Sequence, residues 1–422
     1  MISKINTVSY SEVHGKLSAP ASKSVMIRAI VAATLARGTS ILLNPSFCED
    51  SISAMKLAEF LGAKMEQNSD HIIIEGGNTL QNGSLNCGES GLSLRMFSAV
   101  ASLFNEEMEL IGTGSLKDRP LGDLAEPLRA MGVEVTTNNG FLPVKVKGPL
   151  RGGRVKINGS LSSQFLTGML MSLPLIEADS FLVVENLKSK AYIDLSLNVM
   201  RDFGIVAEHN NYLEFHIPGG QTYKSREYFV EGDWSGAAFL LTAGAIAGQI
   251  EVSGLDPESM QADKMILEAL KKAGARIEQG SKRLKVSRKE LNAFQFDVSE
   301  CPDLAPPLVS LASHCKGTSV LSGIERLIAK ESNRAKTLKE EFEKLGIKIT
   351  IEGKQMKILG GRLSGGRVIS HNDHRIAMAV AVAALRATDT VSIDGSECVS
   401  KSYPGFFNDL KLVGGNVYET NM

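Results

Sequence analysis

The segment HNDHRIAM, from His371 to Met378, places two imidazoles, a carboxylate and a guanidinium beside the start of an apolar run. Asp373 is a good N-cap for a helix that begins there, which accounts for one of these four groups. His374 and Arg375 then fall on the first helical turn, where free backbone N–H groups and the helix dipole favour a bound anion. The segment therefore predicts an anion site at a helix start.

The same segment has the donors for a metal site, because His371 and His374 stand three positions apart with Asp373 between them. Nothing else in the sequence suggests a metal, so we favour the anion site. The chain also lacks the GxxxxGK[ST] pattern of a phosphate-binding loop and a strand-linked GxGxxG pattern. We expect no metal and no cofactor.

Five other segments share the position of this helix start in an internal repeat. The six segments read SKSVMIR, GESGLSLR, LSSQFLT, GDWSGAAF, CPDLAPPL and HNDHRIAM. Their equivalent residues are Ser22, Ser90, Ser162, Ser235, Asp303 and Asp373, at separations of 68 to 73 residues. Serine and aspartate are favoured N-caps, so capping explains these six residues. It does not explain Lys23, Arg28 or Gln164 beside them, which predicts a binding role for some copies.

A second repeated pattern joins an amphipathic helix, a glycine and alternating apolar residues. The glycines are Gly62, Gly132, Gly204, Gly274, Gly346 and Gly414, at separations of 68 to 72 residues. Glycine just past a helix adopts left-handed geometry at little cost, and the alternation after it is typical of a strand. A second strand should follow after a turn, as in HIIIEGG and LPVKVKG. The even spacing predicts six repeats.

Six repeats of about 70 residues are too many for one core, whereas two sets of three match usual domain sizes. Only eight residues follow Gly414, so the sixth repeat is short, and residues 1 to about 20 should complete it. We expect one domain from residues 1–20 plus 231–422 and another from residues 21–230. The crossings should lie near Ala19–Ala21 and Val230–Gly232.

The loops before the glycine-terminated helices also carry charge at repeat-equivalent positions. These loops contain Lys117, Arg119, Lys330, Glu331, Arg334 and Lys401. A solvated surface would explain any one loop, but the whole set favours a small ligand with several anionic groups, held in a cleft between the domains.

Composition excludes other classes of partner. The net charge is −1 over 422 residues, so no overall basic field favours nucleic acid or an anionic membrane. The five cysteines form no CxxC pair, which fits a reducing compartment. The N-terminus has no signal-peptide pattern, and the apolar runs are too short to span a bilayer. We expect a cytoplasmic protein, and a monomer.

The motifs together resemble those of the EPSP synthase family, the 3-phosphoshikimate 1-carboxyvinyltransferases of the shikimate pathway. The resemblance rests on APASKSVMIRA, LSSQFLTGML, SKAYID, EGDWS, KESNR and NDHRIAM, in the family's order and spacing. It implies an α/β fold of two inside-out domains, each of three βαβαββ units, with the active site in the interdomain cleft. It also implies enolpyruvyl transfer from phosphoenolpyruvate to the 5-hydroxyl of shikimate 3-phosphate, with release of phosphate.

The resemblance assigns roles residue by residue. The residues implied to contact shikimate 3-phosphate are Lys23, Ser24, Arg28, Ser162, Ser163, Gln164, Ser189, Tyr192, Asp303 and Lys330. Those implied to hold phosphoenolpyruvate are Lys23, Gly91, Arg119, Gln164, Arg334, Arg375 and Lys401. The reaction needs an acid and a base, and the resemblance points to Asp303 and Glu331, with Lys23 as a further catalytic residue. Asp373 is interpreted mainly as a cap.

The sequence departs from the family's pattern at several positions. The usual GN[SA]GT reads GESGL, with Glu89 for Asn and Leu92 for Thr, and Met96 replaces a common Pro. Ile328 stands for a basic residue and Asn333 for the Asp of KESDR. Glu89 should weaken anion binding unless its charge is paired or turned away. These changes leave the phosphoenolpyruvate pocket open to question.

Two alternatives remain. UDP-N-acetylglucosamine enolpyruvyl transferase shares the fold and donor, but that family carries a Cys before the Arg of the second repeat, where this chain reads GTGSLKDRP. A catalytically silent anion-binding homologue is the other, and the presence of Lys23, Asp303, Glu331 and Lys401 argues against it.

Overall fold

The computed structural model describes residues 4–77, 84–122, 124–160 and 162–421, and the chain forms two compact units. The terminal unit consists of Met1–Ser22 and Glu231–Met422, and the central unit consists of Lys23–Val230. The first segment of the terminal unit thus ends at Ser22, whereas the sequence analysis placed that boundary after residue 20.

The described central unit contains three four-stranded sheets, in the strand orders β14-β3-β5-β4, β6-β7-β9-β8 and β10-β11-β13-β12. The strands are β3 (Gly38–Leu43), β4 (Lys64–Gln67), β5 (His71–Gly76), β6 (Ser84–Asn86), β7 (Glu107–Ile111), β8 (Glu134–Asn138), β9 (Phe141–Lys147), β10 (Gly153–Asn158), β11 (Ser180–Glu185), β12 (Glu208–Asn210), β13 (Glu214–Ile217) and β14 (Glu227–Phe229). The helices are α1 (Lys23–Leu35), α2 (Glu49–Phe60), α3 (Gly91–Ala101), η1 (Gly114–Asp118), α4 (Ala125–Ala130), α5 (Gln164–Ser172), η2 (Leu173–Leu175) and α6 (Lys190–Asp202).

The described terminal unit repeats this plan with the orders β16-β17-β15-β2, β18-β19-β21-β20 and β22-β23-β1-β24. The strands are β1 (Lys4–Ser9), β2 (Val13–Ser18), β15 (Gly248–Ser253), β16 (Arg276–Gln279), β17 (Arg283–Ser287), β18 (Gln295–Asp297), β19 (Thr318–Ser322), β20 (Lys348–Glu352), β21 (Gln355–Leu359), β22 (Gly366–Ile369), β23 (Val391–Asp394) and β24 (Asn416–Asn421). The helices are α7 (Trp234–Ala247), η3 (Ala262–Met265), α8 (Ile266–Ala273), η4 (Pro302–Leu304), α9 (Ala305–Ser313), η5 (Ile324–Leu327), α10 (Arg334–Lys344), α11 (His374–Ala384), η6 (Ser396–Lys401) and α12 (Phe406–Leu412).

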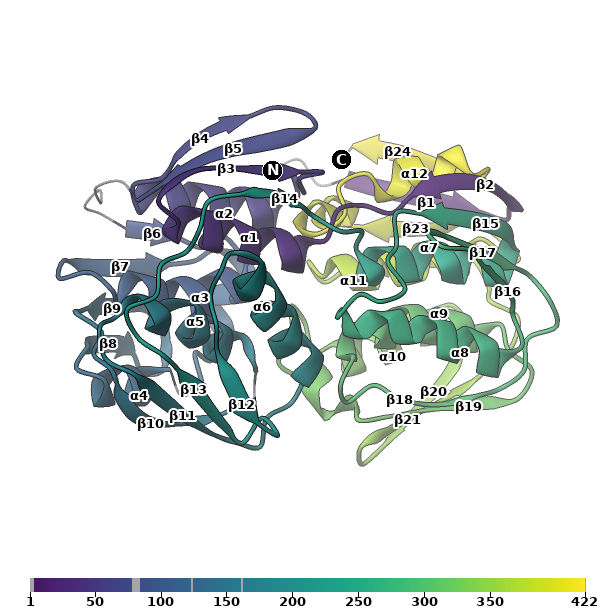
Figure 1. Cartoon of the computed structure of the whole chain (residues 1–422). Coiled ribbons are helices and arrows are strands. Elements are labelled where there is room, and N and C mark those ends of the chain that lie inside the picture. Colours follow the sequence, from purple (N-terminus) through teal and green to yellow (C-terminus); the bar gives the residue numbers. More distant parts are fainter. Residues whose placement is uncertain (1–3, 78–83, 123, 161, 422) are drawn as a thin grey trace. The chain divides into compact units, whose positions relative to one another are not determined.

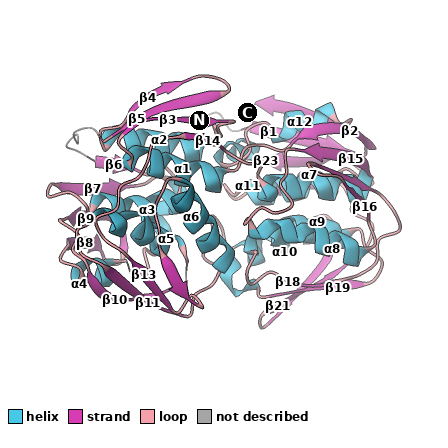
Figure 2. Ribbon diagram, in the orientation of Figure 1, coloured by secondary structure: helices cyan, strands magenta, loops and turns pink. Residues whose placement is uncertain are grey.

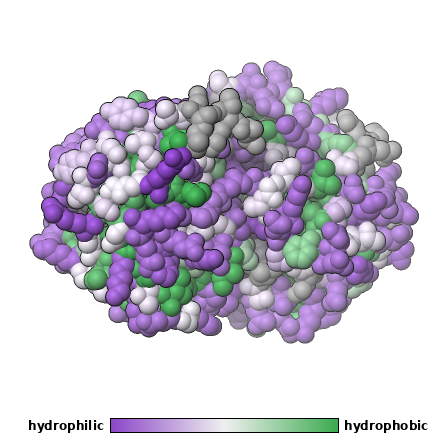
Figure 3. All heavy atoms as spheres, turned by 180° about the vertical axis from the view of Figure 1, so that it is seen from behind, coloured by the Kyte–Doolittle hydropathy of each residue, from purple (hydrophilic) through white to green (hydrophobic). Residues whose placement is uncertain are grey.

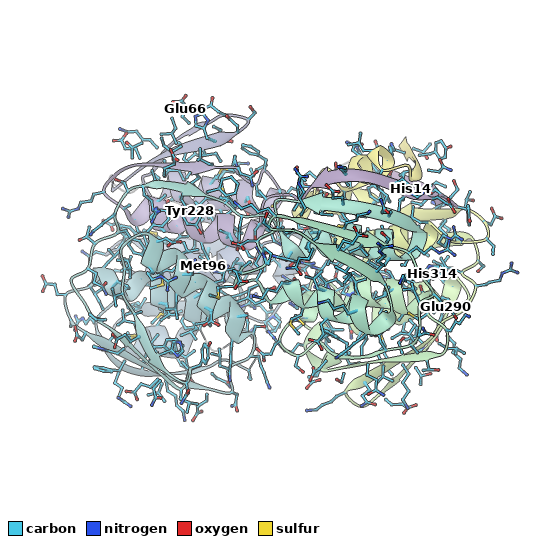
Figure 4. All side chains as sticks on the ribbon, turned by 45° about the vertical axis from the view of Figure 1, so that its right-hand side comes forward. His14, Glu66, Met96, Tyr228, Glu290 and His314 are labelled. Carbon is cyan, nitrogen blue, oxygen red and sulfur yellow. The ribbon has the colours of Figure 1, made fainter. Side chains whose placement is uncertain are left out.

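Within each unit the helices lie inside and the sheets outside (Figures 1 and 2). The helices α3, α7 and α11 are buried along their whole lengths, and their sequences are mostly apolar and carry few charged residues. Met96 of α3 is buried inside the central unit (Figure 4). In the terminal unit, His314 at the end of α9 lies 3.0 Å from the carbonyl oxygen of Ala383 in α11.

Each repeat has the order βαβαββ. In β10 and β11, for example, the two strands joined by α5 pair in parallel, and β13 and β12 then continue the sheet in antiparallel pairs. The predicted fold class, two α/β domains of three such repeats, is confirmed. The six repeat glycines all have positive φ, from 84° to 100°, as the helix-glycine-strand pattern predicted.

The strand that completes each set of repeats comes from a distant part of the chain. The strand β1 lies between β23 and β24, so the N-terminus does complete the sixth repeat. The strand β2 instead pairs in parallel with β15 of the fourth repeat. The expectation that residues 1 to about 20 all belong to the sixth repeat is therefore wrong for its second half. In the central unit, β14 likewise supplies the first repeat's parallel strand beside β3.

The surface carries no extended apolar area on the face that Figure 3 shows, where hydrophilic residues cover most of each unit. Over the described residues, no helix is long and apolar enough to cross a membrane. The five cysteines are all buried and unpaired with one another.

Candidate active site

Arg334, the first residue of α10, lies at the centre of a buried ionic cluster in the terminal unit. Its Nη1 donates to Asp303 Oδ1 at 2.7 Å and its Nε donates to Asp373 Oδ2 at 2.8 Å, while Nη2 donates to Glu331. Burial acts against the charge, but Asp373, Glu331 and Asp303 raise the pKa of Arg334 above its ordinary value. One guanidinium thus joins Asp303 and Glu331, the two residues predicted as the acid–base pair.

Asp303 lies among three cations. Besides Arg334, its carboxylate accepts from Lys330 Nζ and from Arg375 Nη2, each at 3.3 Å. Burial alone would raise the pKa of Asp303, but Arg375, Lys330 and Arg334 together hold it well below its usual value. Asp303 belongs to η4, and the N-cap of α9 is Leu304, which makes no side-chain cap bond. This copy of the repeated position therefore has a counterion where Ser90 and Asp373 cap their helices. The expected caps are wrong for two further copies, because Asp233 caps α7 in place of Ser235 and the N-cap residue of α5 is Ser163.

Asp373 has two tasks. Its Oδ1 accepts from the backbone N–H of Arg375 at 3.0 Å, which confirms that it caps α11. The interpretation that it is mainly a cap is wrong, however, because Oδ2 also accepts from Arg334 and from Ser332 Oγ, the latter at 3.0 Å. Asp373 is fully buried, so it anchors both the α10 start and the α11 start.

The turn before α11 is held in left-handed geometry by two contacts. His371 and Asn372 have φ values of 53° and 54°. His371 Nε2 lies 2.6 Å from Glu341 Oε1, and Lys401 Nζ donates to the carbonyl oxygen of Asn372 at 2.7 Å. Lys401, a predicted phosphoenolpyruvate ligand, thus reaches the same helix start as Arg375. The His371 ring is engaged by a carboxylate of α10.

Asp263 is a buried acid beside this cluster that the sequence analysis did not select. It lies in η3, and Ser235 Oγ donates to its Oδ2. Its side chain is buried, and within the described chain its Oδ1 has no hydrogen-bond partner. Burial raises the pKa of Asp263 to about 7, and the nearby charge of Asp303 adds to this rise while Arg375 opposes it.

In the central unit, the start of α1 carries two predicted ligands. Lys23 Nζ donates to Asp50 Oδ2 at 2.8 Å, and both side chains are largely buried. Arg28 is fully buried and donates from Nε to Ser196 Oγ at 2.8 Å and from Nη1 to the carbonyl oxygen of Ser24 at 2.7 Å. Its Nη2 donates to the carbonyl oxygen of Tyr192 at 3.3 Å. Arg28 therefore links predicted ligands of the first and third repeats.

The starts of α3 and α5 meet around Gly91. A Cβ placed on Gly91 would lie 3.0 Å from Nη1 of Arg119, 3.0 Å from Nη1 of Arg95 and 3.7 Å from Oε1 of Gln164. Arg95 Nη1 donates to Gln164 Oε1 at 3.2 Å, and Arg95 Nη2 donates to the carbonyl oxygen of Pro120 at 2.8 Å. The structure thus brings together three residues predicted to hold phosphoenolpyruvate, and adds Arg95.

The serines of the third repeat lie at two helix starts. Ser162 Oγ accepts from the backbone N–H of Gln164 at 3.1 Å, and Ser163 is the buried N-cap residue of α5. Ser189 precedes α6 with a φ of 55°, and Tyr192 lies in the first turn of that helix. Because Arg28 binds the carbonyl of Tyr192, these residues lie on the same side of the central unit as α1.

Sequence comparison places this site in a known family. A family model described as "EPSP synthase (3-phosphoshikimate 1-carboxyvinyltransferase)" matches residues 8–410. A 3-phosphoshikimate 1-carboxyvinyltransferase of Clostridium perfringens is 40% identical over 412 residues, which is 96% of this chain and 97% of the relative. The chain belongs to the EPSP synthase family. Another 3-phosphoshikimate 1-carboxyvinyltransferase, of Methanocorpusculum labreanum, is 38% identical over 98% of this chain and 99% of its own.

Solved structures agree with this membership. The EPSP synthase of Acinetobacter baumannii matches with a TM-score of 0.84 and 25% identity, covering 99% of this chain and 100% of its own. The enolpyruvyl transferase NikO from Streptomyces tendae matches with a TM-score of 0.81 over all of both chains, but at 15% identity it supports the fold alone.

The departures from the EPSP synthase pattern have separate structural settings. Leu92 and Met96 are buried in α3, and Ile328 is 60% exposed. Asn333 is the N-cap of α10, and its side chain accepts from the N–H of Lys336 at 3.2 Å. Glu89 accepts from Ser115, so its charge is directed at a neighbouring loop of the same unit.

Four residues that contact this cluster or the predicted ligands were not selected from the sequence: Asp50, Arg95, Asp263 and Glu341. Only Arg95 belongs to one of the six helix-start segments. Asp50 and Asp263 belong to CEDS and QADK, two of the repeat-equivalent charged loops, and Arg95 ends the GESGLSLR segment. The repeat position was therefore an available signal for these three. Glu341 lies within α10 and carried none. Across the described residues, no cluster of three or more His, Cys, Asp or Glu side chains could hold a metal ion.

Proposed function

We propose that the chain transfers the enolpyruvyl group of phosphoenolpyruvate to the 5-hydroxyl of shikimate 3-phosphate, giving 5-enolpyruvylshikimate 3-phosphate and phosphate. Family membership over nearly the whole chain supports this step of the shikimate pathway, which leads to chorismate and the aromatic amino acids. The observation that carries the proposal is the cluster in which Arg334 joins Asp303 and Glu331. The reaction needs one group that takes a proton and another that gives one.

The geometry favours Asp303 as the base. Three cations keep its pKa low, so the carboxylate is ionised and can accept the proton of the 5-hydroxyl. The hydroxyl oxygen then bonds to the central carbon of phosphoenolpyruvate while Glu331 protonates the methylene carbon. In the tetrahedral intermediate, Glu331 takes a proton back from the new methyl group, and the bond between the central carbon and the phosphate oxygen breaks. The leaving phosphate takes the proton that Asp303 received, so both carboxyl groups return to their starting states. Arg334 contacts both carboxylates and keeps them at fixed positions.

The two units supply different ligands in this proposal. For shikimate 3-phosphate, the central unit provides Lys23, Ser24, Arg28, Ser162, Ser163, Gln164, Ser189 and Tyr192, and the terminal unit provides Asp303 and Lys330. For phosphoenolpyruvate, the central unit provides Lys23, Gly91, Arg119 and Gln164, and the terminal unit provides Arg334, Arg375 and Lys401. Arginine suits both substrates because its planar fork binds carboxylate and phosphate in pairs of hydrogen bonds.

Phosphate release measured with phosphoenolpyruvate and each of two acceptors tests the proposal. We expect release with shikimate 3-phosphate and none with UDP-N-acetylglucosamine, and Asp303→Asn should abolish the release. Activity with the UDP-sugar alone would assign the chain to the other enolpyruvyl transfer. No release with either acceptor, from a protein that binds shikimate 3-phosphate in calorimetry, would mark a silent homologue.

We further propose that the protein is a cytoplasmic monomer that uses these small substrates without nucleic acid or a membrane. Its near-neutral charge and unpaired cysteines support this. Sedimentation equilibrium should give the mass of one chain, 45.4 kDa. A mass that doubles at working concentrations would contradict the proposal.

A further inference from the structure

Glu89 accepts hydrogen bonds from the loop that leads to Arg119. Its Oε2 accepts from the backbone N–H of Ser115 at 3.1 Å and from Ser115 Oγ at 3.0 Å. Next to it, the backbone N–H of Thr113 donates to the carbonyl oxygen of Gly88 at 2.7 Å. Thr113 is the N-cap residue of η1 and makes no side-chain cap bond of its own. The cap of η1 is therefore the carboxylate of Glu89, which belongs to the GESGLSLR segment earlier in the chain.

The loop approaches Glu89 so closely that Gly114 is required. Gly114 has a φ of 50°, which glycine adopts readily. A Cβ at this position would lie 2.3 to 2.5 Å from the carboxyl atoms of Glu89, which is closer than real Cβ atoms approach other atoms. The Glu89 carboxylate therefore fills the space beside Gly114. Two independent observations, the Ser115 hydrogen bonds and this close approach, connect the same pair of segments.

The C-terminal end of the loop, at Arg119 and Pro120, lies beside Gly91 at the C-terminal end of the segment from Gly88 to Gly91. Two residues after Glu89, Gly91 stands where Arg119 and Arg95 converge, and a Cβ there would meet a nitrogen of each at 3.0 Å. Arg95 also contacts this loop, because its Nη2 donates to the carbonyl oxygen of Pro120. The segment from Gly88 to Gly91 thus contacts the beginning of the loop through Glu89 and its end through Gly91.

We infer that Glu89 is a positioning residue, which sets the place of the Arg119 guanidinium over Gly91 and so tunes binding of phosphoenolpyruvate. The inference rests on the proposed function, which assigns Arg119 to phosphoenolpyruvate. It also explains how a carboxylate is accommodated in a segment expected to bind an anion. Its Oε2 accepts two hydrogen bonds from Ser115, so this oxygen is directed into the loop.

The central test is steady-state kinetics of Glu89→Ala and Glu89→Gln. Glu89→Ala should raise the KM for phosphoenolpyruvate about 10-fold or more, the usual effect of losing hydrogen bonds to a charged group. The KM for shikimate 3-phosphate should change by less than about twofold. Glu89→Gln should stay within about threefold of the parent, since its amide oxygen still accepts from Ser115. Glu107→Ala is the matched control, because Glu107 is an exposed acid of β7 in the same unit, and it should behave as the parent.

A double-variant cycle tests the contact itself. Ser115→Ala should raise the same KM, and the Glu89→Ala, Ser115→Ala pair should be clearly less than additive because both remove one interaction. Gly114→Ala should also raise that KM, and much of its effect should disappear in the Glu89→Ala background, where the clash with the carboxyl group is gone.

Several results would overturn the inference. An unchanged KM for phosphoenolpyruvate in folded Glu89→Ala, a lowered KM, or equal increases for both substrates would each show that Glu89 does not position Arg119. A Glu89→Gln variant as impaired as Glu89→Ala would do the same. Arg119→Ala distinguishes the failure of the proposed function from the failure of this inference. If Arg119→Ala leaves the KM for phosphoenolpyruvate unchanged, the proposed role of Arg119 is wrong. If Arg119→Ala raises that KM strongly while Glu89→Ala does not, only the inference about Glu89 is wrong.

Discussion

The two units bury their arginines against different partners. In the terminal unit, Arg334 and Arg375 donate to carboxylates, which outweigh the effect of burial and raise the pKa of both residues. In the central unit, Arg28 and Arg95 donate to serine, amide and backbone carbonyl oxygens among the described residues. Burial there lowers the pKa of each to about 10. The terminal unit pairs these two buried arginines with carboxylates, whereas the central unit pairs Arg28 and Arg95 with neutral acceptors.

This difference suggests a division of tasks. A buried carboxylate that stays ionised needs cations beside it, and the terminal unit has such a mixed cluster around Asp303. A buried guanidinium held only by neutral oxygens costs free energy that an anion can offset when it binds. Under the proposed function, the fixed donors of the central unit would serve the polyanionic acceptor.

The largest expected effect falls on the acid–base pair of the terminal unit. Glu331→Gln keeps the shape of the side chain but cannot exchange the proton, so the turnover number should fall by about 10²–10⁴-fold. Calorimetric affinities for both substrates should change much less. Glu325→Gln, in η5 shortly before it, is the matched control and should turn over normally. Near-normal turnover of Glu331→Gln would remove Glu331 from the mechanism.

Stability should respond differently to the loss of one arginine in each unit. Arg334→Met leaves Asp303, Glu331 and Asp373 buried without their shared cation, which should cost about 3–5 kcal/mol. Arg28→Met leaves only neutral acceptors unsatisfied and should cost about 1–3 kcal/mol. Urea unfolding, with hydrogen exchange of peptides from each unit, measures both losses separately. Equal losses would mean that the two kinds of arginine environment are energetically alike.

The architecture was predictable from sequence because its determinants are local and repeated. A glycine just past each helix must accept a positive φ, and Gly62 and its five equivalents do so. Strand alternation and wholly apolar helices follow from which faces are buried. The pairing of β2 with β15 of the fourth repeat was not predictable from the sequence. The strands β1 and β2 have similar patterns, and only tertiary pairing decides which sheet each one joins.

The site was predictable as a set of positions rather than as a set of contacts. Asp303 and Asp373 occupy the same place in the repeat, yet one is a counterion and the other both caps and pairs. Their roles depend on what a neighbouring repeat presents, and Arg334 lies 31 residues from one and 39 from the other. Arg95 and Gln164 are 69 residues apart. Contact partners that lie so far apart in the chain leave no pattern in the local sequence of either residue.

Arg375 offers a smaller test, because it pairs with a carboxylate and is also a proposed ligand. Arg375→Ala should weaken phosphoenolpyruvate binding by about 1.5–3 kcal/mol, the contribution of a charge-assisted hydrogen bond. Binding of shikimate 3-phosphate should be nearly kept. Calorimetric titration of each substrate measures the split, with Arg386→Ala as a control just beyond the other end of the same helix. If Arg375→Ala binds both substrates normally and only melts earlier, the charge is structural.

A last effect is the pH dependence that Asp263 adds to the terminal unit. The groups that face it are Ser235, Asp303, Arg375 and Asp233, and its pKa is about 7 in the folded protein against an ordinary 3.8. Between about pH 4 and 7, the folded protein keeps a proton on Asp263 that the unfolded chain has released. Stability from this residue should therefore fall as pH rises, by up to about 1.4 kcal/mol per pH unit, and level off above the folded pKa.

Urea unfolding at several pH values, for the parent and for Asp263→Asn, measures this slope as a difference. The asparagine cannot ionise, so the stability of Asp263→Asn relative to the parent should rise steadily from about pH 4 to about pH 7. Burial lowers the pKa of His314 to about 4 and gives an opposite slope, but that slope is common to both proteins and cancels. Asp389→Asn, an exposed change in the same unit, should leave the profile unchanged. Parallel curves for the parent and Asp263→Asn would show that Asp263 is ionised throughout, and the terminal unit would then hold one more buried negative charge than its arginines are inferred to balance.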